Sequence, residues 1–150
     1  MSIEKDIKQK SFKSDYQKAM INLVFTYNWI TEKLKHIFEE EGLTMQQFNI
    51  LRILRGSPTP LSTLQIRERM LDKMSDTSRI VDRLIIKELT KKITCKADKR
   101  LVDITITTKG LKVLEKLDIQ EDKIENILKN LTENEAETLN ILLDKIRQSN

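Results

Sequence analysis

The sequence predicts a mainly α-helical fold with one small β-hairpin, in the order α-α-α-α-β-β-α-α. Its 150 residues include only three glycines and two prolines and are rich in Leu, Ile, Lys and Glu, which favour helices. Apolar residues recur at spacings of three and four along most of the chain, which is the period of an amphipathic helix. Residues 101–107 instead alternate between apolar and polar, which is the period of a strand.

Composition excludes several classes of protein. No apolar run approaches the roughly 18–20 residues of a membrane span, and the acidic residues among the first ten positions do not fit a signal peptide. The single histidine, His36, and the single cysteine, Cys95, cannot build the common zinc sites or an internal disulfide. No glycine-rich phosphate-binding motif is present. We therefore expect one cytoplasmic domain over 1–150, without a metal, a cofactor or a membrane partner.

The positive charge is concentrated in one segment. The net charge is +4, and residues 73–110 hold ten Lys and Arg against five Asp and Glu, whereas the rest of the chain holds 17 against 18. A local basic patch is typical of nucleic-acid binding, although a solvated, Lys-rich surface explains the charge equally well. All seven aromatic residues lie within the first 48 positions. A basic segment without rings on which bases can stack favours a duplex over single strands.

Residues 12–38 predict one long helix with two apolar faces. One stripe recurs at spacings of three and four along the helix, and Phe25, Trp29 and His36 lie on nearly the opposite side. Such a helix needs two covering surfaces, which a second subunit or the core of a monomer can supply. We favour a dimer because the remaining helices are too few to enclose this one.

Capping boxes mark the next two helices. Gly42 ends the long helix, and a Thr-x-x-Gln box over 44–47 opens a second one. The second helix ends in the stretch 55–60, which is rich in helix breakers. A Ser-x-x-Gln box over 62–65 then opens a third helix, which is predicted to run to about Leu71.

A fourth helix is predicted from Ser75, as its cap, to about Leu89. Its Ile, Val and Leu residues form a buried side, whereas Ser75, Arg79 and Arg83 recur every four residues on an outward face, with Ser78 and Asp82 beside them. Two short helices joined by a tight turn, the second with Ser and Arg on an exposed face, describe a helix-turn-helix. The second helix of such a unit can enter a major groove of DNA.

Two strands with a basic tip follow the fourth helix. Alternate residues of 102–106 are apolar and share one face, and Ile93 and Cys95 are predicted to share the apolar face of the preceding strand. The tip, 96–100, carries Lys and Arg. A hairpin with a basic tip after a helix-turn-helix is the wing of a winged helix-turn-helix.

Two apolar helices are predicted at the C-terminal end of the sequence. Thr107 caps the first, which carries Leu and Ile at helical spacing to residue 128. A Thr-x-x-Glu capping box over 132–135 opens the second, which runs to about Ile146. The basic unit therefore lies in the middle of the sequence, with apolar helices on both sides of it.

Four stretches of the chain carry recognisable motifs. They are LTMQQFNILRIL (43–54), SDTSRIVDRL (75–84), ADKRLVDITITTKG (97–110) and LTENEAETLNILLDKI (131–146). The most specific motif is Asp98-Lys-Arg100 followed by Ile106-Thr-Thr-Lys-Gly110. In this order the four stretches resemble the MarR (multiple antibiotic resistance regulator) family of bacterial transcription regulators, and the resemblance covers about residues 12–147.

The resemblance implies a homodimer whose terminal helices, in 12–42 and 107–148, interlock, and a winged helix-turn-helix lobe over 43–106 that binds duplex DNA. It implies that the fourth helix reads a major groove, and that Arg100, held by Asp98, reaches a minor groove. Lysines of the hairpin would supply charge to phosphates. The residues expected to bind DNA are Ser62, Ser75, Asp76, Ser78, Arg79, Arg83, Lys92, Asp98, Lys99 and Arg100.

Two residues depart from the usual pattern of the family. Glu88 stands where the family usually has Gly, which adopts the left-handed conformation at a helix end easily. Asp76 stands where a neutral Ser or Thr is common. Its carboxylate repels phosphate, but it can accept from a cytosine amine or stabilise the helix start. The first helix lacks the cysteine of redox-sensing members, so we do not expect peroxide sensing by that route.

We expect a dimeric repressor that binds a pseudo-palindromic operator and is released by a small aromatic or phenolic effector. The resemblance implies that anionic aromatic compounds bind between the dimer helices and the DNA-binding lobe. Phe25, Trp29 and His36 are candidates for this pocket, although core packing also explains them. The alternative is an architectural or protein-interaction DNA-binding module without a ligand-controlled operator. An enzyme that uses Cys95 and His36 is not expected, because they lie on separate elements and no motif orients them.

Overall fold

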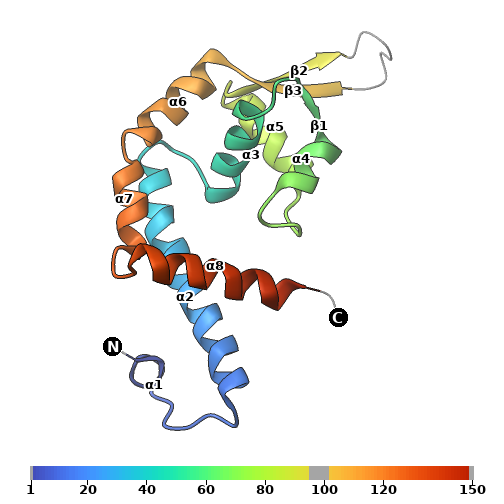
Figure 1. The fold of residues 1–150 in the computed structure, drawn as a ribbon. Helices are drawn as coiled ribbons and strands as arrows, with labels where there is room; N and C mark the ends of the chain where they lie inside the picture. The colour runs from blue at the N-terminus through green and yellow to red at the C-terminus, as the bar shows by residue number, and fades with distance from the viewer. Residues whose placement is uncertain (1, 95–101, 149–150) are drawn as a thin grey trace.

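The computed structural model describes residues 2–94 and 102–148. Figure 1 shows a lobe that holds the small sheet with α3, α4 and α5, and long helices, α2 and α8, outside that lobe. The predicted fold class, mainly helical with a small antiparallel sheet, is confirmed. The elements in chain order are α1 (Ile3–Asp6), α2 (Asp15–Glu39), α3 (Met45–Arg55), β1 (Leu61–Ser62), α4 (Thr63–Arg69), α5 (Thr77–Ile86), β2 (Thr90–Thr94), β3 (Val102–Ile106), α6 (Thr108–Asp118), α7 (Glu121–Glu125), the 3-10 helix η1 (Asn126–Leu128) and α8 (Glu133–Arg147).

Four predicted helix starts are confirmed by their side-chain caps. The hydroxyls of Thr44 and Ser62 each accept from the backbone N–H three residues later, at 3.2 Å, and the glutamine at that position accepts from the cap's own N–H. Thr132 and Glu135 form the same box at α8, and Thr107 caps α6. Each cap satisfies backbone donors that a helix start otherwise leaves free.

The ends of three helices differ from the prediction. α2 begins at Asp15, three residues later than predicted, because the Ser14 hydroxyl accepts from a backbone N–H of the first turn, and the short α1 precedes it. α4 ends at Arg69 rather than at Leu71, because Met70 takes an extended conformation. α5 ends at Ile86 rather than near Leu89, because Glu88 takes a left-handed conformation. None of these differences moves an apolar face to a new side of its helix.

The prediction of one continuous helix over 107–128 is wrong. α6 ends at Asp118, and the chain turns at 119–120 before α7 begins. The guanidinium of Arg55 donates two hydrogen bonds to the Asp118 carboxylate, at 2.6 and 3.1 Å. The turn also lets apolar residues of α7 and η1 pack against the core. No glycine or proline marks this turn. It follows from contacts between residues far apart in the sequence, which local periodicity does not report.

A third strand, β1, completes the sheet and was not predicted. The antiparallel order is β1-β3-β2, with Leu61 opposite Ile104. Ile104 is buried, whereas Ile93 lies opposite Asp103, beside Ile104, and is 38% exposed. Opposed residues of an antiparallel pair point to one face, so Ile93 faces away from the core. The prediction for Ile93 is therefore wrong, because cross-strand register and not alternation alone sets the face. Cys95 lies outside the described residues.

The core lies in the lobe, where α3 packs against α2, α5, α6 and β3. Ile50 and Leu51 of α3 have no exposed surface. The rings of Phe38 and Phe48 stack with their centroids 4.3 Å apart, which joins the end of α2 to α3. The lobe is therefore packed on the C-terminal end of the long helix, and α3 lies at its centre.

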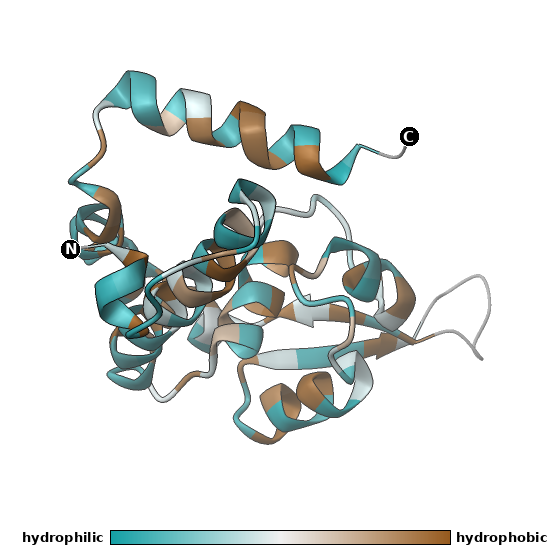
Figure 2. Ribbon diagram, turned by 90° about the horizontal axis from the view of Figure 1, so that it is seen from below, coloured by the Kyte–Doolittle hydropathy of each residue, from teal (hydrophilic) through white to brown (hydrophobic). Residues whose placement is uncertain are grey.

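The remainder of α2, and all of α8, have large apolar side chains in solvent. Only the last turns of α2 contain buried residues, and α8 contains none. Tyr16 is 90% exposed and Ile141 is 62% exposed. Figure 2 shows apolar stretches along α8. In the described part of the chain, no helix is both long enough and apolar enough to cross a membrane.

Candidate nucleic-acid interface

α5 has one buried side and one charged side, as the sequence predicts. Val81 and Leu84 pack in the core, and α3, α4 and β2 all contact α5. The remaining side carries Ser78, Arg79 and Arg83, which are exposed. Residues four apart lie above one another on a helix, so the two guanidinium groups share one surface. α4 and α5 together form the predicted helix-turn-helix.

The cap of α5 is Asp76 and not Ser75. The Asp76 carboxylate accepts from the backbone N–H of Arg79 at 3.1 Å. Ser75 instead donates its hydroxyl to the Asp72 carboxylate at 2.7 Å, and the N–H of Met74 donates to the same group at 3.0 Å. These hydrogen bonds, that of Ser75 first, hold the pKa of Asp72 below its usual value. The prediction of a Ser75 cap is wrong because Asp72, which sequence reasoning missed, binds that hydroxyl.

Two hollows flank the first turn of α5. One, of about 440 Å³, lies toward α4 and is lined by Thr63, Arg67 and 74–78 among others. The other, of about 280 Å³, lies toward the start of α3 and includes Arg83. Ser62 is next to the first hollow, where its hydroxyl is used to cap α4. Arg67 lines the first hollow together with the first turn of α5, so it is a third arginine near the exposed side of that helix. It was not among the residues predicted from the sequence.

Lys92 is brought to α5 by the register of the sheet. It lies opposite Ile104, on the sheet face that packs against the helices. Its ammonium lies 3.1 Å from the carboxylate of Asp82 on α5. Both side chains are more than half exposed, so the pair adds little to stability. The ion pair with Asp82 orients Lys92 beside the exposed face of α5 that carries Arg79 and Arg83. Asp82 itself was not predicted to bind DNA.

Three of the predicted DNA-binding residues belong to the tip of the predicted hairpin, 96–100. Asp98, Lys99 and Arg100 lie outside the described residues. The strands that lead to them are paired as far as Thr94 and Val102. The roles assigned to these three residues therefore stay predictions.

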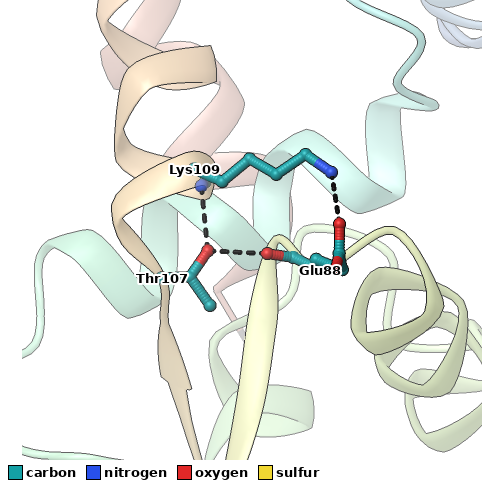
Figure 3. Close-up of polar contacts among 4 residues, drawn as sticks. Glu88, Thr107 and Lys109 are labelled. Atoms are coloured by element: carbon teal, nitrogen blue, oxygen red, sulfur yellow. Dashed lines mark hydrogen bonds and ion pairs between the residues drawn. The ribbon is translucent and has the colours of Figure 1, made fainter.

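The end of α5 is tied to the start of α6. Glu88 takes a left-handed conformation, with φ at 61°, as glycine would at this place. The Thr107 hydroxyl donates to the Glu88 carbonyl at 2.8 Å, and Lys109 donates to the Glu88 carboxylate at 2.8 Å (Figure 3). The Lys109 contact holds the pKa of Glu88 below its usual value. A Cβ on Gly110 would lie only 2.3 Å from the Leu89 carbonyl oxygen, so the two segments touch directly.

A hollow of about 660 Å³ lies between α2 and the start of α3. Its lining does not include the three predicted pocket residues, Phe25, Trp29 and His36, which are exposed on α2 about a quarter turn away. Trp29 is 40% exposed, and the Lys33 ammonium lies 4.7 Å from its ring centroid. The hollow is lined by Asn28, Thr31, Glu32, Lys35, Glu39, Gly42, Leu43, Thr44, Met45 and Gln46.

No metal site is found among residues 2–94 and 102–148: they contain no cluster of three or more His, Cys, Asp or Glu side chains that could hold an ion. The surface formed by α5 and Lys92 offers donors of hydrogen bonds and positive charge. Such groups recognise phosphates and base edges.

Comparison with known proteins agrees with this arrangement. No family model matches the sequence. MarR of Escherichia coli (strain K12), a multiple antibiotic resistance protein, is 27% identical over 139 residues, which are 89% of this chain and 96% of that protein. The crystal structure of a MarR transcription factor from Planctomyces limnophilus is 32% identical, with a TM-score of 0.67, and covers 89% of this chain and 98% of that one.

Two further solved structures share the fold of this chain. A mutant of Escherichia coli MarR was solved with operator DNA; it is 22% identical, with a TM-score of 0.79, over 93% of this chain and 100% of that one. BpsR of Bordetella bronchiseptica, whose DNA binding is regulated by 6-hydroxynicotinic acid, is 20% identical, with a TM-score of 0.80, over 94% of this chain and 100% of that one.

Proposed function

This chain belongs to the MarR family of transcription regulators, and we propose that it is a homodimeric repressor that binds a pseudo-palindromic site in duplex DNA. We assign residues 43–106 to the DNA-binding lobe and the helices of 12–42 and 107–148 to dimerisation. The observation that carries the proposal is the outward face of α5, where Arg79 and Arg83 are exposed while the opposite side of the helix is buried.

In the dimer, each α5 enters a major groove. Two such helices must lie roughly 34–36 Å apart to meet successive major grooves on one side of B-form DNA. Arg79 and Arg83 contact base edges or flanking phosphates, with Ser78 beside them. Lys92 and the wing residues Lys99 and Arg100 supply charge to phosphates and to the adjacent minor groove, and Asp98 holds Arg100.

The exposed apolar side chains of α2 and α8 support the dimer. Large apolar surfaces are rare on monomers, and here exposed apolar side chains recur along both α2 and α8. A second copy that covers both helices would remove Tyr16 and Ile141 from water. It would also hold the two α5 helices at one separation.

A small aromatic or phenolic effector that binds between the dimer helices and the lobe would control that separation. The hollow between α2 and α3 lies at this junction and supports a ligand site there. Lys35 in its lining lies 3.6 Å from the Glu39 carboxylate, and Glu32 also lines the hollow, so an acidic ligand would have to displace Glu39 from Lys35. BpsR, which shares the fold, is regulated by an aromatic acid. Phe25, Trp29 and His36 remain candidate contacts, and titration of Trp29 fluorescence with phenolic acids tests them. An unchanged signal together with unchanged DNA affinity would leave no role for these compounds.

The test of DNA binding is selection of duplexes from a random pool, followed by footprinting and a salt series on the selected sequence. We expect a protected pseudo-palindrome of two half-sites. Arg79→Ala, Arg83→Ala and Arg100→Ala should each weaken binding by about 1–3 kcal/mol, and loss of a phosphate contact should lower the salt slope by about 1. Lys112→Ala, on α6, is the charge-matched control and should retain most of the affinity.

Two outcomes would contradict this function. A protein with no preference for any duplex does not have an operator. A steep salt dependence without a protected palindrome would instead identify an architectural DNA-binding protein, because phosphate contacts alone give affinity without sequence preference.

A further inference from the structure

Lys87, the residue that follows α5, links that helix to the corner where α2 meets α3. Its ammonium donates to the carbonyl oxygen of Gly42 at 2.5 Å and to Oε1 of Gln47 at 3.0 Å. The three residues lie 40 and 45 positions apart in the sequence, so these contacts exist only in the folded chain. A bond with a charged donor is roughly twice as strong as a neutral one.

Both acceptors are held in place by other contacts. Gly42 has φ at 67°, and the backbone N–H groups of Gly42 and Leu43 donate to the last carbonyls of α2, which closes that helix. Gln47 is buried, and its Oε1 also accepts the backbone N–H of Thr44 at 3.2 Å. The corner over 42–47 is therefore a rigid unit to which Lys87 attaches the end of α5.

The same corner forms one wall of the hollow of about 660 Å³. Gly42 and Thr44, which carry or support the acceptors of Lys87, both line that hollow together with Thr31 of α2. A molecule in the hollow would therefore lie against the segment to which Lys87 is bonded. A shift of Gly42 or Thr44 would move the acceptors of Lys87, and with them the contact at the end of α5.

We propose that Lys87 is the positioning residue that couples occupancy of the hollow between α2 and α3 to the DNA affinity of α5. This inference rests on the proposed function, since it needs a DNA-binding α5. A lysine near a helix C-terminus also stabilises the helix itself by its charge. The coupling role and the helix-stabilising role of Lys87 can be told apart by experiment. Only if Lys87 couples the two sites does its replacement change the effect of a group bound in the hollow on DNA affinity.

The experiment fills the hollow with a probe in place of an unknown ligand. In a Cys95→Ser background, Thr31→Cys provides one thiol in the hollow, and N-phenylmaleimide attaches an aromatic group to it. DNA affinity for the selected duplex is measured before and after labelling, in the Lys87 protein and in Lys87→Met. We expect labelling to change the dissociation constant by about fivefold or more with Lys87 and by less than about twofold with Lys87→Met. Lys87→Arg should restore the larger effect.

Controls separate this inference from loss of charge, of folding or of DNA binding. Lys112→Met removes the same charge from α6 and should leave the effect of labelling at full size. Circular dichroism checks the fold, and Lys87→Gln serves as a second variant if Lys87→Met does not fold. An equal effect of labelling with and without Lys87, or no effect with Lys87, overturns the inference. Failure of the unlabelled protein to bind any duplex would instead overturn the proposed function.

Discussion

Gly110 lies where the start of α6 touches the segment that follows α5. A Cβ there would meet the Leu89 carbonyl oxygen at 2.3 Å and Cγ1 of Ile106 at 2.8 Å, and a backbone carbonyl cannot rotate out of the way. The close approach, and not backbone conformation, explains the glycine. The start of α6 is therefore in direct contact with the segment that follows α5.

Gly110→Ala should therefore lower the free energy of unfolding by about 1–3 kcal/mol, as overpacking usually does. Urea denaturation measures this loss. Gly56→Ala is the matched control, because a Cβ at Gly56 meets nothing closer than 3.5 Å and its φ is ordinary for any residue. The control should change stability by less than about 0.5 kcal/mol. Equal effects at both positions would contradict the contact.

Glu88 illustrates the opposite case, a side chain at a backbone conformation that favours glycine. A left-handed residue other than glycine costs roughly 1–2 kcal/mol. The ion pair of Glu88 with Lys109 is exposed and offsets little of that cost. In Figure 3, Thr107 and Lys109 both donate to Glu88, and the Thr107 hydroxyl also accepts from the backbone N–H of Gly110, so the contacts form one network at this junction.

Glu88→Gly and Glu88→Ala both remove the ion pair, so their difference reports the backbone alone. We expect Glu88→Gly to be the more stable of the two by about 1 kcal/mol, since only glycine relieves the left-handed strain. Thermal or urea unfolding compares them. Equal stability of the two variants would mean that the conformation at this position carries no strain.

At the scale of the element, Asp76 of α5 has two roles, because it caps the helix and lies on the face proposed to contact DNA. The Asp76 carboxylate satisfies a backbone donor at the helix start and is itself exposed on the side that faces DNA in the proposed complex. A negative charge here stabilises the helix end but repels phosphate. Stability and DNA affinity therefore place opposite demands on this position.

Asp76→Asn separates the two demands, because Asn is as good an N-cap as Asp. We expect stability to change by less than about 1 kcal/mol and DNA affinity to rise by about fivefold, the worth of roughly 1 kcal/mol for a screened charge pair. Asp76→Ala should instead cost about 1 kcal/mol of stability. Unfolding curves and duplex titrations measure both. A fall in affinity for Asp76→Asn would mean that the carboxylate accepts from a base.

At the scale of the whole molecule, the long helices α2 and α8 lie outside the lobe that holds α3, α4 and α5 (Figure 1). Ile141 lies on α8, which buries nothing within its own chain. Ile141→Glu should therefore leave the folded chain intact while placing a charge in the proposed dimer interface, where an unpaired buried charge is strongly unfavourable.

We expect Ile141→Glu to be monomeric at micromolar concentration by sedimentation, with a helical circular dichroism spectrum and DNA affinity lowered to that of one half-site. Ile86→Glu, an exposed apolar residue at the end of α5, is the control and should remain dimeric. A dimer that survives Ile141→Glu would remove α8 from the interface.

Features that depend on a few neighbouring residues were predictable from the sequence. The caps at Thr44, Ser62, Thr107 and Thr132 were read correctly, because an N-cap and its backbone donors lie within four residues of one another. The exposed arginines of α5 follow in the same way from helical periodicity. The wing residues and the pocket aromatics remain predictions.

Features that depend on pairing between distant residues were not predictable. The bend after α6 reflects contacts such as that of Arg55 with Asp118, the face of Ile93 reflects its register against β3, and the link from Lys87 to Gly42 spans 45 positions. The local sequence pattern therefore predicted the helices, their caps and the charged face of α5. Tertiary contacts decided the bend, the third strand and the link from Lys87 to the corner between α2 and α3, because these contacts join groups that meet only once the chain has folded.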